Sequence, residues 1–346
     1  MSLLSNLSPD ARLSALQDWL ATLGLVDVAS ARPASADASF RRYFRVDTLP
    51  AAQAHGATLV AMDAPPEREN VLAYVKLDEM LIHAGVSVPR IVATDYERGF
   101  MLMSDLGSTT YLQVLDHDNA STLYADALGA LLQFQLTSVP GVLPEYDRAF
   151  LLRELKLFPE WYISRHLGAT LTDKQSAELD GVFDAILAVV TAQQQVYVHR
   201  DFHSRNLMRM DAANPGVLDF QDALYGPVTY DAASLLRDAY IQWDEELVLD
   251  WLVRYWQQAK EAGLPVNPDI DGFYRDFEFT ALQRHLKILG IFCRLNYRDG
   301  KDAYLGDLPT VLDYVRKTAG RYRELKPLLR LLDALDNVAP TVGYTF

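Results

Sequence analysis

One eight-residue motif constrains this chain more than any other feature of its sequence. Residues 199–206 read HRDFHSRN, and Asp219 follows Asn206 after thirteen residues. Asp201 supplies a carboxylate that could accept a hydroxyl proton, whereas Asn206 and Asp219 carry the hard oxygen ligands that Mg²⁺ takes. Phosphoryl transfer asks a protein for positioning of metal, phosphates and acceptor hydroxyl more than for covalent chemistry. The motif therefore predicts a phosphoryl-transfer site.

The segments around the motif predict two short strands. Residues 196–198 are Val-Tyr-Val and residues 216–218 are Gly-Val-Leu, and the intervening residues 211–215 are rich in turn formers. Two strands joined in this way would present Asp201 and Asp219 from neighbouring strand ends.

The motif resembles the catalytic and metal-binding loops of the aminoglycoside phosphotransferase and choline kinase superfamily. It also satisfies the protein-kinase frame H-R-D-x-x-x-x-N, but residues 219–221 read DFQ instead of DFG and no A-P-E follows. The chain thus resembles a small-molecule kinase rather than a protein kinase. The resemblance implies ATP as donor, Asp201 as catalytic base, Asn206 and Asp219 as Mg²⁺ ligands, and Asp231 as a brace for the loop.

The same resemblance implies an α+β, bilobal, protein-kinase-like fold. Its small β-rich N-lobe, residues 1–103, would bind nucleotide, and its larger, mostly helical C-lobe, residues 104–346, would carry the catalytic loop, metal site and substrate pocket. The residue pattern predicts helices at 10–23 and 69–83, strands around 40–46, 59–62, 91–94 and 100–103, and an irregular loop at 29–38. Further helices are expected at 121–136, 151–165 with a break at Pro159, 173–194, 230–240, 245–262, 270–295 and 308–335 with a break.

Several stretches narrow the resemblance within the superfamily. Residues 39–45, 62–66, 198–208, 219–223 and 225–238 are very similar to the bacterial anomeric kinases of N-acetylmuramate and N-acetylglucosamine. Those enzymes phosphorylate the C1 hydroxyl of a cell-wall amino sugar in peptidoglycan recycling, and a sugar-1-phosphate nucleotidyltransferase uses the product. The resemblance therefore implies an amino-sugar substrate and a functional link to such a nucleotidyltransferase.

The N-terminal region departs from the kinase pattern at the phosphate clamp. It has no G-x-G-x-x-G, and the strand at residues 58–63 lacks the lysine that pairs with the α- and β-phosphates in kinases. A clamp without its cation loses electrostatic stabilisation, so another basic residue should replace it. Arg41 and Arg42 are the expected replacements, and Arg45 is a further candidate.

The hinge between the lobes is expected at residues 101–107, where an apolar strand meets a glycine turn. Backbone groups of this segment hold the adenine edge in the superfamily, so we expect nucleotide contacts at Met103, Asp105 and Leu106. An ordinary strand end would explain the same residues.

Other polar residues near the motif receive separate expectations. Arg205 would act with Asp201 by steadying the transferred phosphoryl group, and His199 would support the loop through hydrogen bonds. His203 and Arg237 are candidate sugar contacts. Further candidates for the sugar pocket, for which core packing is the simpler explanation, are Glu160, Trp161, Asp238, Trp243 and Arg284.

Composition limits the partners and the compartment. The formal net charge is −14 and no run of Lys and Arg occurs, which argues against nucleic-acid binding. The single cysteine, Cys293, cannot form an intramolecular disulfide, and no apolar run reaches the roughly 18 residues of a membrane span. We expect a cytoplasmic protein without membrane partners.

Three alternatives stay open at this point. The first is a kinase for another small alcohol, such as an aminoglycoside, choline or homoserine. The second is a nucleotide-binding pseudokinase, suggested by the missing lysine and glycine loop. The third is a metal hydrolase built from His199, Asp201, His203, Asp219 and Asp222, although these residues lack the His and Cys spacing of zinc sites.

Overall fold

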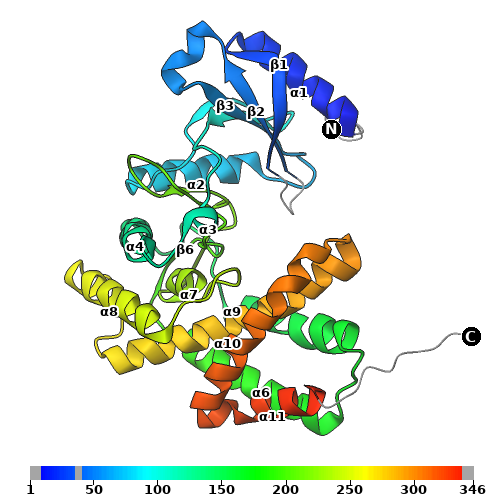
Figure 1. The fold of residues 1–346 in the computed structure, drawn as a ribbon, viewed down its shortest axis with the longest axis vertical. Coiled ribbons are helices and arrows are strands. Elements are labelled where there is room, and N and C mark those ends of the chain that lie inside the picture. Colours follow the sequence, from blue (N-terminus) through cyan, green and yellow to red (C-terminus); the bar gives the residue numbers. More distant parts are fainter. Residues whose placement is uncertain (1–8, 36–40, 337–346) are drawn as a thin grey trace, which may run out of the picture. The chain divides into compact units, whose positions relative to one another are not determined.

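A computed structural model describes residues 9–35 and 41–336 of the chain. The chain divides into two compact units, which we describe separately. Unit 1 comprises Met1–Leu115 and Arg205–Asp222, and unit 2 comprises Asp116–Ser204 and Ala223–Phe346. Unit 1 contains an antiparallel sheet and unit 2 is mostly helical (Figure 1). The predicted α+β class is therefore confirmed.

Unit 1 is built on a five-stranded antiparallel sheet of order β1-β2-β3-β5-β4. Helix α1 packs on it through Leu16, Trp19 and Leu20, which are almost completely buried together with strand residues such as Leu59 and Leu102. The strands are β1 (Val26–Ser35), β2 (Arg42–Thr48), β3 (Thr58–Asp63), β4 (Ile91–Asp95) and β5 (Phe100–Ser104), and the helices are α1 (Pro9–Leu23), η1 (Pro50–His55), α2 (Val71–His83) and α3 (Tyr111–Val114). The predicted helices at 10–23 and 69–83 are thus present within two residues.

The irregular loop predicted at residues 29–38 is wrong over most of its length. Strand β1 extends to Ser35 and pairs with β2, with Arg32 opposite Arg45 and Pro33 opposite Phe44. A run rich in Ala and Ser carries no strand signal of its own, but β2 supplies hydrogen-bond partners along its edge. Residues 36–40, where the rest of the loop and the start of the predicted 40–46 strand fall, lie outside the described residues.

The segment Arg205–Asp222 belongs to unit 1 although it is distant in sequence. It contains the small hairpin of β7 (Leu207–Met208) and β8 (Gly216–Val217). The Val217 amide donates to the Ser87 carbonyl at 2.7 Å and the Arg209 amide to the Thr109 carbonyl at 2.8 Å. Unit 1 therefore extends beyond residue 103 and includes a second segment of the chain. The division into an N-lobe of residues 1–103 and a C-lobe of residues 104–346 stays a prediction.

The strands on either side of the turn do not pair with each other as expected. Strand β6 (Gln195–Val198) pairs with β9 (Leu224–Pro227) in unit 2, whereas β8 pairs with β7 in unit 1. Strand pairing is a long-range property, and alternation along one short run does not select its partner.

Unit 2 is organised around the 30-residue helix α9, whose residues 281–290 are all buried. Gly290 allows the close approach of the neighbouring π-helix, because a Cβ there would lie 2.5 Å from the Leu157 backbone. Its other helices are α4 (Ala120–Leu136), α5 (Arg148–Leu155), the π-helix η2 (Phe158–His166), α6 (Asp173–Val190), α7 (Tyr230–Leu236), α8 (Glu245–Glu261), α9 (Ile270–Asp299), η3 (Asp302–Asp307), α10 (Leu308–Arg321), η4 (Arg323–Leu325) and α11 (Lys326–Asp336).

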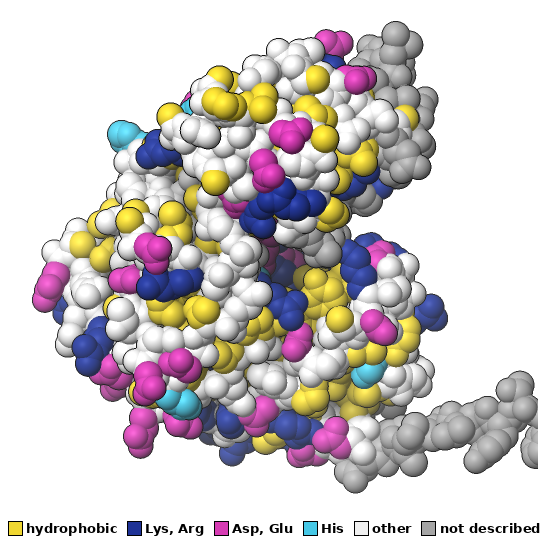
Figure 2. Space-filling model, turned by 45° about the horizontal axis from the view of Figure 1, so that its top comes forward, with side chains coloured by type: hydrophobic (Ala, Val, Ile, Leu, Met, Phe, Trp, Pro, Cys, Tyr) yellow, Lys and Arg dark blue, Asp and Glu magenta, His cyan; other side chains and the backbone are white. Residues whose placement is uncertain are grey.

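The helices predicted for this region are confirmed, with ends that differ by up to four residues. The predicted break at Pro159 coincides with the change from α5 to η2, since proline removes a helix hydrogen bond. No helix among the described residues is long and apolar enough to cross a membrane. On the face drawn in Figure 2, Lys and Arg side chains lie beside Asp and Glu side chains.

Candidate active site

The loop that carries the HRDFHSRN motif follows β6, and Asp231 of α7 binds its start. The Asp231 carboxylate accepts the His199 amide at 2.6 Å and the Arg200 amide at 2.9 Å, and its side chain is completely buried. Arg200 adopts a left-handed backbone conformation, with φ of 76°, which a non-glycine residue keeps only where its surroundings impose it. The Asp201 amide donates to His199 Nδ1 at 3.3 Å. Asp231 and His199 thus both accept backbone amides of the loop, and their supporting roles stay predictions.

A buried ionic network lies beneath this loop. Glu154 of α5 accepts from Arg200 at 2.8 Å and forms an ion pair with Lys287 of α9 at 3.1 Å. The Tyr146 hydroxyl donates to the same carboxylate, and the Arg200 guanidinium lies over the Tyr146 ring at 5.4 Å. Burial raises the pKa of Glu154, but the charges of Lys287 and Arg200 outweigh it and lower that pKa below its ordinary value. The network holds the side chain of Arg200, which directly precedes Asp201 in the chain.

Asp201 itself is half-buried and close to positive charges from α9. Burial raises its pKa, but Lys287 and then Arg284 oppose this more strongly, and the pKa of Asp201 lies well below its ordinary value. Asp201 is therefore an anion throughout the physiological pH range. An anionic carboxylate can orient and accept a hydroxyl proton.

His203 and Asp238 complete the surroundings of the loop. Burial lowers the pKa of His203 to about 4, so its ring is neutral at pH 7, and its Nδ1 has no hydrogen-bond partner among residues 9–35 and 41–336. Asp238 accepts the Ser204 amide at 2.9 Å and the Tyr240 amide at 3.0 Å. Arg237, the other expected sugar contact, is buried and pairs with Glu245 at 2.5 Å. Its predicted sugar contact stays a prediction.

The expected metal ligands lie together in unit 1. Asp219 follows β8 and has a φ of 61°, so it adopts the left-handed backbone conformation, as Arg200 does. Gln221 Nε2 donates to the Asp219 carboxylate at 2.7 Å, and the Asp219 side chain is 33% exposed. The Leu218 amide donates to the Asn206 carbonyl at 2.9 Å, which ties the two segments. Arg205 is exposed, and its catalytic role stays a prediction.

These residues fit a hard divalent cation by their donor chemistry. Asp219 offers an accessible carboxylate and Asn206 an amide oxygen, the types that Mg²⁺ accepts, and Asp219 needs no rearrangement to be reached from solvent. No cluster of three or more His, Cys, Asp and Glu side chains suited to a metal occurs within residues 9–35 and 41–336.

The three arginines considered for the phosphate clamp have different partners. Arg41 is buried and lies 3.5 Å from Glu69 and 3.7 Å from Asp219. Arg42 donates through Nε to Asp63 at 3.0 Å, a buried carboxylate that Arg12 also binds. Of the two expected replacements for the kinase lysine, the structure therefore brings only Arg41 to Asp219.

The third arginine contacts the segment in which the sequence predicts the hinge. Arg45 donates to Asp105 at 3.0 Å, and Thr58 donates to the same carboxylate at 2.7 Å. Burial alone would raise the pKa of Asp105, but these hydrogen bonds outweigh burial and lower that pKa below its ordinary value. Met103 is buried in β5, where the Tyr74 hydroxyl meets its sulfur at 3.6 Å, and Leu106 is half-buried. The adenine contacts predicted for this segment stay predictions.

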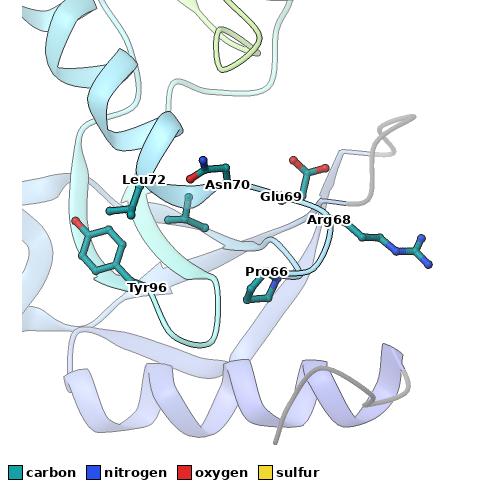
Figure 3. A pocket seen from close by; sticks show the side chains of 7 residues that line it. Pro66, Arg68, Glu69, Asn70, Leu72 and Tyr96 are labelled. Atoms are coloured by element: carbon teal, nitrogen blue, oxygen red, sulfur yellow. The ribbon is translucent and has the colours of Figure 1, made fainter. Parts of the chain in front are cut away.

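A pocket of about 400 Å³ lies at the start of α2 in unit 1. Figure 3 shows Glu69 and Asn70 on the segment that leads into α2, and Tyr96 beside Leu72. Its lining residues are Pro66, Arg68, Glu69, Asn70, Val71, Leu72 and Tyr96. None of the expected hinge residues lines this pocket, so we assign it no nucleotide.

Three charged residues around the catalytic loop were not assigned by sequence reasoning: Glu154, Lys287 and Arg284. They lie between 47 and 86 residues from Asp201 in the chain, on α5 and α9. A charged residue within an otherwise apolar helix pattern is the signal that could have identified them, and the sequence named Arg284 only among the polar and aromatic candidates for the sugar pocket.

Comparison with known proteins places this chain in a family. Residues 30–265 match the phosphotransferase enzyme family. Two curated relatives, from Pseudomonas putida and Neisseria meningitidis serogroup B, are 47% and 46% identical to it over 336 residues, and both are called N-acetylmuramate/N-acetylglucosamine kinase. The alignments cover 94% and 96% of this chain and 97% and 98% of the relatives.

A solved structure shares the fold. The ADP-bound aminoglycoside phosphotransferase APH(2'')-Ib superposes with a TM-score of 0.58 at 16% identity, over 87% of this chain and 97% of its own. The fold, the family match and the near full-length relatives agree with the predicted superfamily. The chain belongs to the phosphotransferase enzyme family.

Proposed function

We propose that this phosphotransferase uses ATP and Mg²⁺ to phosphorylate the anomeric C1 hydroxyl of N-acetylmuramate, N-acetylglucosamine or both. The similarity to two kinases of these sugars, extending over 94% or more of each chain, carries the choice of substrate. The environment of Asp201 supports the choice of reaction, because its carboxylate is held ionised beside a braced loop.

In the proposed reaction, the sugar C1 oxygen forms a bond to the γ-phosphorus while the bond from that phosphorus to the bridging oxygen of ADP breaks. The hydroxyl proton passes to the Asp201 carboxylate. An anomeric hydroxyl is more acidic than an ordinary alcohol, so a carboxylate with a low pKa serves mainly to orient it. Mg²⁺, when bound, neutralises charge on the β- and γ-phosphate oxygens.

Residues of unit 1 would hold the donor. Asn206 and Asp219 are the proposed Mg²⁺ ligands, and Arg41, with Glu69 and Asp219 close by, takes the place of the missing kinase lysine. We further propose that Arg205 steadies the transferred phosphoryl group, that Met103 to Leu106 contact the adenine, and that His203 contacts the sugar.

The product of this reaction would be a sugar α-1-phosphate. Such a product suits a sugar-1-phosphate nucleotidyltransferase in peptidoglycan recycling, and we place the enzyme with that pathway in the cytoplasm as part of the proposal.

A substrate panel tests the proposal directly. The purified enzyme is incubated with Mg-ATP and, separately, N-acetylmuramate, N-acetylglucosamine, an aminoglycoside, choline or homoserine, and ADP formation is followed. Phosphorus NMR of the product then distinguishes an anomeric phosphate from a phosphate on another hydroxyl. Turnover of choline, homoserine or an aminoglycoside with none of either sugar would overturn the substrate assignment.

A further inference from the structure

Arg284 is an unusual residue of α9 in unit 2. Its side chain is 3% exposed, its Nε is enclosed, and that Nε has no hydrogen-bond partner within the described chain. Leaving a buried cationic donor unsatisfied costs stability, and proteins rarely keep such a group without a use. A ligand that supplies the missing acceptor would remove that cost.

The neighbours of Arg284 show where such a ligand would lie. Negative charge from Asp201 and Asp238 acts on the Arg284 guanidinium, and the Tyr230 ring lies 5.9 Å from it. Asp238 already accepts the amides of Ser204 and Tyr240. Arg284 is thus close to the carboxylate that the proposed function assigns to the acceptor hydroxyl.

Other polar atoms of the same surroundings are also unsatisfied. His203 Nδ1 and Ser204 Oγ are enclosed and have no partner among the described residues. Lys287, one helical turn from Arg284, differs because it is bonded to Glu154 and Tyr230. Arg284, His203 and Ser204 therefore each keep a buried polar atom that a ligand near Asp201 could satisfy.

We propose that Arg284 binds the carboxylate of an acidic amino sugar and so determines preference for N-acetylmuramate over N-acetylglucosamine. This inference rests on the proposed function. The two sugars differ only in the lactyl ether that gives N-acetylmuramate its carboxylate, and a guanidinium matches a carboxylate with two parallel hydrogen bonds. N-acetylglucosamine has no anionic group for Arg284.

The first test uses the substrate and leaves the protein unchanged. Wild-type enzyme is compared on N-acetylmuramate, its methyl ester and N-acetylglucosamine. We expect kcat/KM for the ester to fall about 100-fold, to near that for N-acetylglucosamine, since a charged hydrogen-bonded contact is lost. Equal kcat/KM for the acid and its ester would overturn the inference. Failure to phosphorylate either sugar would instead overturn the proposed function.

The second test uses Arg284→Gln, with Lys287→Gln as a matched control for the loss of a buried cation near Asp201. Arg284→Gln should reduce kcat/KM for N-acetylmuramate about 100-fold more than it reduces kcat/KM for N-acetylglucosamine, and in Arg284→Lys this difference between the two sugars should be smaller. Lys287→Gln should reduce both by the same factor. Equal losses on the two sugars in Arg284→Gln would mean that Arg284 only positions Asp201, and would overturn the proposal.

A thermal unfolding measurement accompanies these kinetics. If Arg284→Gln does not fold, the ester comparison on the wild-type enzyme still decides the outcome. In a folded Arg284→Gln enzyme the acid and the ester should become equivalent substrates, because the group that tells them apart is gone.

Discussion

Two carboxylates expected at the phosphoryl-transfer site, Asp219 in unit 1 and Asp201 in unit 2, have contrasting surroundings. Asp219 keeps a third of its side chain exposed and has Gln221 and Arg41 as neighbours. Asp201 is surrounded by cations of α9 and is ionised before any substrate arrives. These surroundings suit the two proposed roles, because a metal ligand has to exchange water for the ion, whereas a group that orients a hydroxyl has to be charged and fixed in advance.

A third carboxylate shows what the cations around Asp201 accomplish. Asp78 of α2 is 2% exposed, and its Oδ1 has no hydrogen-bond partner in the described structure. Burial, followed by the nearby charge of Glu79, raises the pKa of Asp78 to about 7. Asp78 and Asp201 therefore differ in protonation near neutral pH because only Asp201 has strong positive charge close by.

The largest effect is expected when the charge of Asp201 is removed. Asp201→Asn should lower kcat by about 1,000-fold or more, because the hydroxyl loses its acceptor, while Mg-ATP affinity stays within about 3-fold. Steady-state kinetics and isothermal titration measure the two quantities. Normal turnover with weakened nucleotide binding would reverse the assignment of the two carboxylates.

Asp219 should show the opposite division between binding and turnover. Asp219→Ala should weaken Mg-ATP binding by about 100-fold, since a metal ligand is lost. Isothermal titration at several Mg²⁺ concentrations measures this, and Asp47→Ala, on an exposed carboxylate of unit 1, is the control. Unchanged Mg-ATP affinity in Asp219→Ala would remove its metal role.

Arg41 and Arg42 are adjacent in unit 1, and their substitutions should have different effects. Arg41→Met should raise KM for ATP by about 10-fold or more, with partial recovery in Arg41→Lys, because Arg41 lies next to Asp219. Arg42→Met should mainly lower the melting temperature, because it leaves the buried Asp63 with one arginine fewer. A larger rise in KM for ATP in Arg42→Met than in Arg41→Met would contradict the assignment of Arg41 to the phosphate clamp.

The smallest effect concerns stability through Asp78. Its folded pKa of about 7 lies above the ordinary value of 3.8, so the stability lost by ionising Asp78 is absent below pH 3.8 and grows as pH rises towards 7. Asp78→Asn should therefore raise the melting temperature by about 3 °C at pH 8 and less at pH 5. Thermal unfolding between pH 5 and 8 checks this, with Asp18→Asn, an exposed residue of α1, as control. An equal shift at both pH values would contradict the protonation argument.

Local patterns predicted the elements that depend on local interactions. Apolar periodicity located α1, α4 and α8 to within a residue or two at each end, and Pro159 marked the end of α5. Strand β1 and the partners of β6 and β8 were not predicted, because hydrogen bonding to a distant edge determines them.

The site divides in the same way. The sequence alone determined the spacing of Asp201, Asn206 and Asp219, and hence the class of chemistry, since that spacing lies within one short segment. Only the tertiary structure decided which arginine reaches Asp219 and which cations of α9 surround Asp201. Charge–charge interactions depend on distance in space, and Arg284 and Lys287 follow Asp201 by more than 80 residues in the chain.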